Sequence, residues 1–170
     1  SPHRPVWTAD GAGVTVGAFV DGAWRLLTYP VDGKGEPRVL LSGARRLYPS
    51  DWSRDGAKLV YQEDHETTAW DLRVLDRTTG ESSSFASSPA NESTAAVSHD
   101  GKLLAYESDE LDGLVQVHVA AFPGGDQKVL ASANGVRWPV FASDGTLFFW
   151  DTTVLRLASV LTRVEAGRLS

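Results

Sequence analysis

The chain of 170 residues contains no cysteine, which excludes a disulfide framework, a thiolate metal site and a thiol nucleophile. It also contains no methionine, and we therefore expect it to be a segment of a longer protein. No apolar run approaches the roughly 18 to 20 residues that a membrane-spanning helix needs, so membrane insertion is not expected. Basic residues are in the minority, with 16 Lys and Arg against 22 Asp and Glu, and the net charge of -6 argues against a nucleic-acid partner. These absences leave the compartment open, with a periplasmic or extracytoplasmic location favoured slightly over a cytoplasmic one.

What the chain does contain is an Asp-Gly pair followed by an apolar run, four times over. The pairs begin at Asp10, Asp55, Asp100 and Asp144, so the repeat interval is 45, 45 and 44 residues. In a tight turn between two strands, Asp hydrogen-bonds its own neighbouring amides and Gly adopts a positive φ without steric cost. A fixed interval of this length, built only of strand patterns, predicts a β-propeller with one four-stranded sheet per repeat.

The predicted fold is therefore all-β: one propeller segment over residues 1–170, with four consecutive four-stranded antiparallel blades. The blades are expected at residues 5–44, 48–89, 93–134 and 138–170, and the last strand of the fourth is expected to be a stub at Gly167–Ser170. A blade buries its two faces only by stacking on other blades. A bare end face of roughly 500 Å² would forgo on the order of 10 kcal/mol. We therefore expect a partial ring, or half of a larger propeller, whose end faces are covered by closure, by a second copy in a homo-oligomer, or by blades that this chain lacks.

One repeat carries a recognisable motif. Pro49 to Tyr61 reads Pro-x-x-Trp-Ser-x-Asp-Gly-x-x-Leu-Val-Tyr and resembles the repeat of TolB-type, WD-like bacterial propellers. The stretches Asn91 to Gly124 and Arg137 to Asp151 look like propellers found downstream of bacterial serine/threonine kinase domains. The chain departs from that pattern at Arg54 and His99, where the family usually has Pro, and no kinase motif is present. The resemblance implies the fold, but it implies no single function, because the same repeat occurs in transport factors, sensor kinases and propeller-capped peptidases.

No catalytic, metal or cofactor site is predicted. The four turn aspartates would form an acidic ring, yet each is explained by capping its own turn. The acidic segments Glu63–Glu66 and Asp109–Asp112 do not have the spacing of a calcium loop, so we interpret them as solvated loops. The four histidines show no ligand spacing, and there is no Gly-x-Ser-x-Gly nucleophile motif.

The predicted binding surface is the mouth of the central channel, which the loops entering each innermost strand surround. Arg, Tyr and Trp are enriched in protein-binding hot spots. The candidate residues are Arg45, Arg46, Tyr48, Asn91, Glu92, Arg137 and Trp138. The alternative is an ordinary polar loop surface. Trp7 and Trp52 hold equivalent positions in two repeats, which favours core packing for both and leaves Trp138 as the least constrained of the three.

Three functional hypotheses follow. The first is a non-catalytic module that recognises a protein, a peptide or a small ligand, as the sensory or scaffold segment of a larger bacterial protein. The second is the propeller part of a serine peptidase or a polysaccharide lyase whose catalytic residues lie outside this chain. The third is an excised or engineered propeller fragment that self-assembles.

Overall fold

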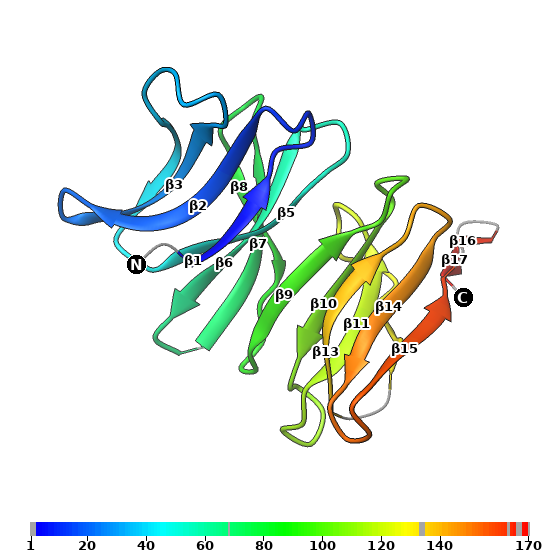
Figure 1. Cartoon of the computed structure of the whole chain (residues 1–170). Coiled ribbons are helices and arrows are strands. Elements are labelled where there is room, and N and C mark those ends of the chain that lie inside the picture. Colours follow the sequence, from blue (N-terminus) through cyan, green and yellow to red (C-terminus); the bar gives the residue numbers. More distant parts are fainter. Residues whose placement is uncertain (1–2, 68, 133–134, 163, 166–167, 170) are drawn as a thin grey trace.

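A computed structural model describes residues 3–67, 69–132, 135–162, 164–165 and 168–169 (Figure 1). Every regular element within these ranges is a β-strand. The described residues accordingly contain no helix that is long and apolar enough to cross a membrane. The all-β prediction is confirmed.

The first three repeats each form a four-stranded antiparallel sheet in which the strands follow chain order. The first sheet consists of β1 (His3–Trp7), β2 (Gly13–Val20), β3 (Ala23–Pro30) and β4 (Arg38–Gly43). The second consists of β5 (Leu47–Trp52), β6 (Lys58–His65), β7 (Ala69–Asp76) and β8 (Ser82–Ala86). The third consists of β9 (Glu92–Val97), β10 (Leu103–Ser108), β11 (Gln116–Ala121) and β12 (Val129–Leu130).

The fourth sheet differs from the prediction at its outer edge. It has three strands, β13 (Val136–Phe141), β14 (Thr146–Asp151) and β15 (Arg156–Leu161). β17 (Arg168–Leu169) pairs with β16 (Val164–Glu165) rather than with β15, so the expected fourth strand is wrong for these two residues. Gly167 and Ser170 lie outside the described residues. Only two residues separate β15 from β16, whereas five to seven separate the third and fourth strands of the other sheets, so the connection after β15 differs from that of the other blades.

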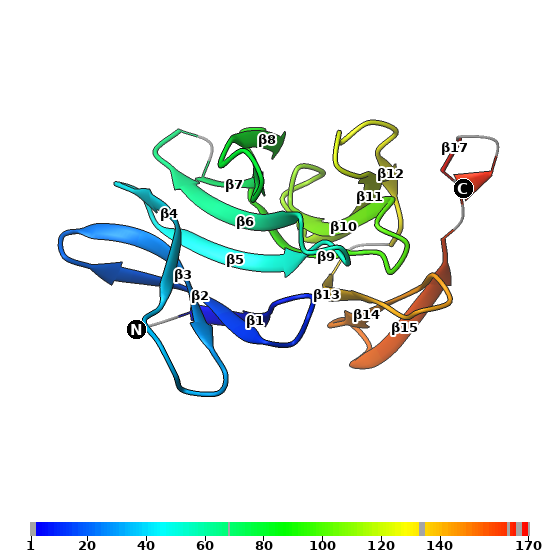
Figure 2. The same ribbon diagram turned by 90° about the horizontal axis from the view of Figure 1, so that it is seen from above.

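The four sheets follow one another in an arc, with the innermost strands β1, β5, β9 and β13 toward the middle (Figure 2). A depression of about 240 Å³ lies where these strands end, and all four sheets contribute to it. Its lining includes Trp7, Trp52, His99 and Phe141, one from each repeat. The sheets therefore fan about a shared axis, as a propeller requires.

Apolar side chains fill the spaces between successive sheets. In the third sheet every residue of Leu103–Ser108 is buried, because both faces of the strand are covered. Leu104 packs with Val60 of the second sheet, while Leu103 packs with Leu147 of the fourth. This two-sided burial explains why the inner repeats show apolar runs instead of strict alternation.

The first two sheets approach each other closely at Gly17 on β2. A Cβ atom at this position would lie 1.9 Å from the backbone oxygen of Leu47 on β5. Next to this contact, Leu26 of the first sheet packs with Leu59 and Tyr61 of the second. The missing side chain of Gly17 is thus what allows the two backbones to meet at this point.

The Asp-Gly pairs make the predicted turns. Asp55 Oδ1 accepts hydrogen bonds from Ser53 Oγ at 2.6 Å and from the Ala57 amide at 2.9 Å, and Gly56 has a φ of 68°. The hydrogen bond from Ser53 is the largest of the effects that lower the pKa of Asp55. The same arrangement at Asp10 supports turn capping as the role of these aspartates.

Candidate functional site

The strand order decides which loops share an end of the propeller. Because the strands are antiparallel, the loops that enter each innermost strand lie at the same end as the loops between second and third strands, opposite the Asp-Gly turns. A pocket of about 360 Å³ opens at this end, between the second, third and fourth sheets. Its lining consists of Tyr48, Gln62, Trp70, Asn91, Ser93, Glu107, Asp109, Val115 and Arg137.

Three of the seven predicted binding residues meet in this pocket. Tyr48 comes from β5, Asn91 directly precedes β9, and Arg137 lies on β13. They are separated by more than forty residues in the sequence, about one repeat each. The pocket thus joins three consecutive blades, which we call the mouth pocket.

Glu107 holds the fourth blade against the third at the rim of the mouth pocket. Its side chain is 2% exposed, and its carboxylate accepts a hydrogen bond from the Trp138 amide at 2.8 Å. Arg137 Nη1 donates to the same carboxylate at 3.3 Å. Trp138 stands at an irregularity in the pairing of β13 with β14 and has a φ of 59°. Glu107 therefore fixes the backbone that presents Arg137 and the indole of Trp138, which is 55% exposed.

Asp109 fixes the position of Asn91 within the third blade. Its two carboxylate oxygens accept hydrogen bonds from the Asn91 amide at 2.7 Å and from Asn91 Nδ2 at 2.8 Å. The loop that enters β9 is thereby tied to the end of β10. Asn91 is thus held in place in the wall of the mouth pocket.

A row of aromatic side chains leads from the first blade to the mouth pocket. The ring of Phe19 lies 5.7 Å from that of Trp24, Trp24 lies edge-on to Tyr48 at 5.8 Å, and Tyr48 stacks on Trp70 at 5.1 Å. The Arg46 guanidinium lies over the Trp70 ring, 5.0 Å from its centre. We call Phe19, Trp24, Tyr48 and Trp70 the aromatic row.

Arg45 and Arg46 lie beside the mouth pocket and are not part of its lining. Arg46 Nε donates to Asp64 Oδ2 at 2.6 Å, and this hydrogen bond raises the pKa of the guanidinium. Arg45 Nη1 donates to the backbone oxygen of Asp64 at 3.4 Å. Both arginines thus brace the loop before β5 against the end of β6.

Glu92 lies in the interior, so its place among the predicted contact residues is wrong. Its side chain is 1% exposed and accepts a hydrogen bond from Ser88 Oγ at 2.5 Å. Burial is the largest effect on its carboxyl and raises the pKa. Side chains alternate along a strand, so Asn91 and Ser93 line the mouth pocket while Glu92 points to the other side.

The prediction of core packing holds for one of the two repeat-equivalent tryptophans and not for the other. Trp52 is 6% exposed, and its Nε1 donates to Thr15 Oγ1 of the first blade at 3.1 Å, so core packing is confirmed there. Trp7 is 64% exposed, and the core prediction is wrong for it. It is paired across the sheet with Val14, on the face opposite to Thr15, and no preceding blade packs on that face in the described chain. Trp7 and Trp52 therefore hold equivalent positions in the repeat but differ in burial, because Trp7 lies in the first blade of the arc.

Six residues that line the mouth pocket were not among those predicted from the sequence. They are Gln62, Trp70, Ser93, Glu107, Asp109 and Val115. Most of them lie at or near the loops between second and third strands, which antiparallel pairing places at the channel mouth. That rule was available from the strand order alone, and it would have identified Trp70 and Asp109.

The acidic segments considered as cation sites are occupied by ion pairs. β6 continues to His65, so Glu63 and Asp64 belong to a strand and not to a loop. Glu63 pairs with Arg73 at 3.3 Å, and Glu110 pairs with Lys128. Within the described ranges, no three His, Cys, Asp or Glu side chains are grouped as a metal ion would need.

Comparison with known proteins supports the fold and leaves the function open. No protein-family model matches the chain, and no curated protein matches it. Among solved structures, a protein assigned as TolB from Agrobacterium tumefaciens superposes with a TM-score of 0.76 at 18% identity, covering 96% of this chain and 62% of that one. An oligogalacturonate lyase in complex with manganese gives 0.68 at 16% identity, covering 99% and 51%. A chain of a nidogen/laminin complex gives 0.69 at 10% identity, covering 94% and 59%.

These similarities show the fold, a β-propeller, as predicted from the repeat. The chain spans 51 to 62% of the length of the three structures, so each of them continues beyond the part that it matches. One is a lyase and another comes from a protein complex, which illustrates that this fold carries different functions.

Proposed function

We propose that this chain is a non-catalytic propeller module that binds a protein or peptide partner at the mouth pocket. The observation that carries the proposal is the convergence of Tyr48, Asn91 and Arg137 from three consecutive blades on one pocket. A partner seated there contacts three blades at once, which gives the pocket the character of a built recognition site.

The chemistry of the surface supports a peptide as the occupant. The rings of Tyr48 and Trp70 are half-buried, so they offer apolar area that is already held in place by stacking and by Arg46. Rigid aromatic side chains and arginine dominate the binding energy of protein interfaces. The Arg137 guanidinium adds a charged group at the far side of the mouth pocket.

A sensory or scaffold role in a larger bacterial protein is part of the same proposal. It is supported by the resemblance of Asn91 to Gly124 to propellers that follow serine/threonine kinase domains. A small ligand at the channel mouth is the alternative occupant, because 360 Å³ is within the range of small-molecule pockets.

Selection from a random peptide library against the immobilised chain tests the proposal. We expect the selected peptides to lose affinity by about tenfold or more with Trp70→Ala or Arg137→Gln, because each variant removes a hot-spot type of side chain. Lys102→Gln, which removes an exposed cation at the opposite end of the propeller, is the matched control and is expected to bind as the parent does. Equal binding by the parent and both mouth-pocket variants would show that the surface lies elsewhere.

We also propose that the two end faces of the arc are covered in the assembled protein. The first sheet exposes Trp7, Tyr29 and Val39, and the fourth exposes Leu157 and Leu161. Exposed apolar patches of this kind are typical of interaction surfaces. A second copy of the chain, or further blades, supplies an apolar sheet face that matches them.

A further inference from the structure

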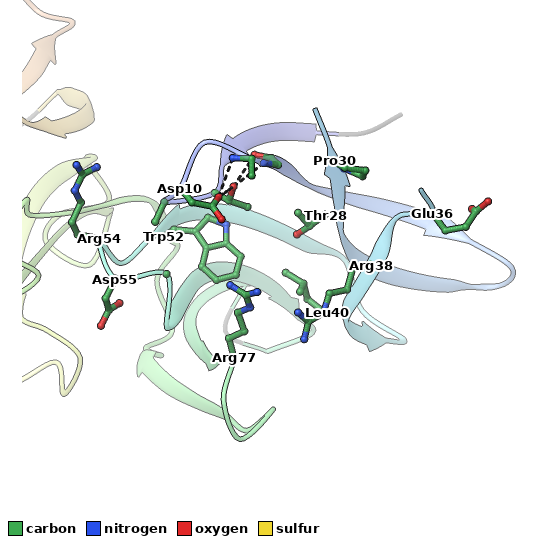
Figure 3. Close-up of a pocket in the computed structure, with 15 residues that line it drawn as sticks. Asp10, Thr28, Pro30, Glu36, Arg38, Leu40, Trp52, Arg54, Asp55 and Arg77 are labelled. Atoms are coloured by element: carbon green, nitrogen blue, oxygen red, sulfur yellow. Dashed lines mark hydrogen bonds between the residues drawn. The ribbon is translucent and has the colours of Figure 1, made fainter. Parts of the chain in front are cut away.

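A second pocket lies at the opposite end of the propeller, between the first and second blades. It encloses about 410 Å³ next to the Asp10 and Asp55 turns (Figure 3). Trp52 and Leu40 provide apolar walls. Arg38 reaches the pocket from the start of β4, and Arg77 reaches it from the loop after β7. We call this the inter-blade pocket.

The indole of Trp52 is held in place and borders the inter-blade pocket with the small part of its side chain that is exposed, 6%. Its only polar atom, Nε1, is already bonded to Thr15 Oγ1, which in turn lies 2.9 Å from Thr28 Oγ1. The ring is buried and cannot rotate without breaking this chain of hydrogen bonds. A flat apolar group in the pocket can therefore contact this fixed ring at little entropic cost.

Arg38 and Arg77 bring positive charge to the inter-blade pocket without a close ion pair in the described part of the chain. Neither Arg38 nor Arg77 forms an ion pair within 4.0 Å among the described residues. Figure 3 shows both guanidinium groups turned toward the same side of the Trp52 ring, while Glu36 extends away from the pocket. Guanidinium groups in this position match the planar geometry of a carboxylate.

Two carboxylates of the lining, Asp10 and Asp55, are charged and are held by their own turns. The hydrogen bond from Thr8 is the largest effect that lowers the pKa of Asp10, and the charge of Arg77 adds to it. Asp10 Oδ1 accepts hydrogen bonds from Thr8 and Ala12, so this oxygen is held within its own turn. Asp55 is held in the same way by its turn. Arg54 also belongs to the lining, but its side chain points away in Figure 3.

The corresponding space between the second and third blades is a useful comparison. It is lined by Lys58 and Asp76, which form an ion pair at 2.8 Å, and no arginine is among the residues lining it. In the first blade, Gly13 and Pro30 take the places of this pair. The ion pair of the second blade is thus absent from the first blade, where Arg38 and Arg77 lie beside Trp52.

We propose that the inter-blade pocket binds a small aromatic carboxylate. The carboxylate lies between the guanidinium groups of Arg38 and Arg77, and the ring contacts Trp52 and Leu40. This site is separate from the mouth pocket and does not depend on it.

Titration of the ¹⁵N-labelled chain with 2-naphthoate tests the proposal, with the indole N–H signal of Trp52 as the local reporter. We expect a dissociation constant of about 1 mM or tighter for a ligand of this size. Arg38→Gln and Arg77→Gln are each expected to weaken binding about tenfold, because each removes a charge-assisted hydrogen bond. Both side chains are exposed, so the fold is expected to survive, and circular dichroism checks it.

Two controls make the result decisive. Arg54→Gln removes an arginine of the same rim that points away, and it is expected to leave the affinity unchanged. The neutral analogue 2-naphthamide keeps the ring and lacks the charge, and it is expected to bind about tenfold more weakly. Equal affinity for the acid and the amide, unchanged binding by the Arg38 and Arg77 variants, or no shift at Trp52 overturns the proposal.

Discussion

Replacement of Glu107 measures how strongly the third blade holds the fourth at the mouth pocket. Glu107→Ala removes the hydrogen bond to the Trp138 amide and the ion pair with Arg137. A hydrogen bond to a charged group contributes about 1.5–3 kcal/mol. An ion pair with a half-exposed arginine adds about 0.2–1 kcal/mol. We therefore expect Glu107→Ala to lower the free energy of unfolding by about 2–3 kcal/mol.

Glu107→Gln separates the two contributions. The amide oxygen of Gln still accepts from the Trp138 N–H, while the ion pair with Arg137 is lost, so the expected cost is about 1 kcal/mol or less. The free energy of unfolding is measured by urea titration followed by circular dichroism. Glu36→Ala is the matched control, because this side chain is exposed, and it is expected to stay within about 0.5 kcal/mol of the parent.

Two outcomes would refute the reasoning. If Glu107→Ala unfolds at the same urea concentration as the parent, the buried carboxylate does not connect the blades. If Glu107→Gln costs as much as Glu107→Ala, the ion pair dominates and the hydrogen bond to the Trp138 amide is unimportant. The first outcome would also remove the structural reason for the fixed position of Arg137.

Three further predictions concern packing, pH and assembly. Gly17→Ala is expected to lower the free energy of unfolding by about 3 kcal/mol or more, because the new Cβ is forced against the backbone of Leu47. Gly43→Ala, whose Cβ would have its nearest contact at 3.6 Å, is the control and is expected to be tolerated. Urea titration measures both. The hydrogen bond from Lys58 lowers the pKa of Asp76 to about 2. The stabilisation from the Asp76 carboxylate is thus complete above its ordinary pKa of 3.8 and disappears as the pH falls toward 2. The difference in urea midpoint between the parent and Asp76→Asn should therefore vanish over that pH window. A constant difference would contradict the assignment. Light scattering of the chain is expected to show a dimer that dissociates on dilution, and a monomer at every concentration would contradict coverage of the end faces by a second copy.

The turns were the most predictable part of the protein. An Asp-Gly turn is formed by residues within a few positions of each other, as at Ser53, Asp55 and Gly56. Such contacts recur wherever the short motif recurs, and therefore the repeat interval predicted the number of blades and their order. Where the motif was followed by a different connection, as after β15, the prediction of the outer strand was wrong.

The candidate site was predictable only in part. Sequence position places Tyr48, Asn91 and Arg137 at the same end of three blades, and the structure brings them to one pocket. Sequence position did not predict the direction in which each side chain points. Glu92 stands next to Asn91 in the sequence and is buried, because alternate residues of a strand face opposite sides.

The strands, the turns and their repetition follow from local sequence, because they depend on backbone preferences and on contacts between near neighbours. Which side chains meet between blades depends instead on the packing of whole sheets. Arg137 reaches Glu107 from thirty residues away, and Trp52 reaches Thr15 from thirty-seven. Such contacts depend on how one sheet packs on the next, and a one-residue change of register or a missing neighbour, as at Trp7, reverses the burial of a side chain whose local sequence is unchanged.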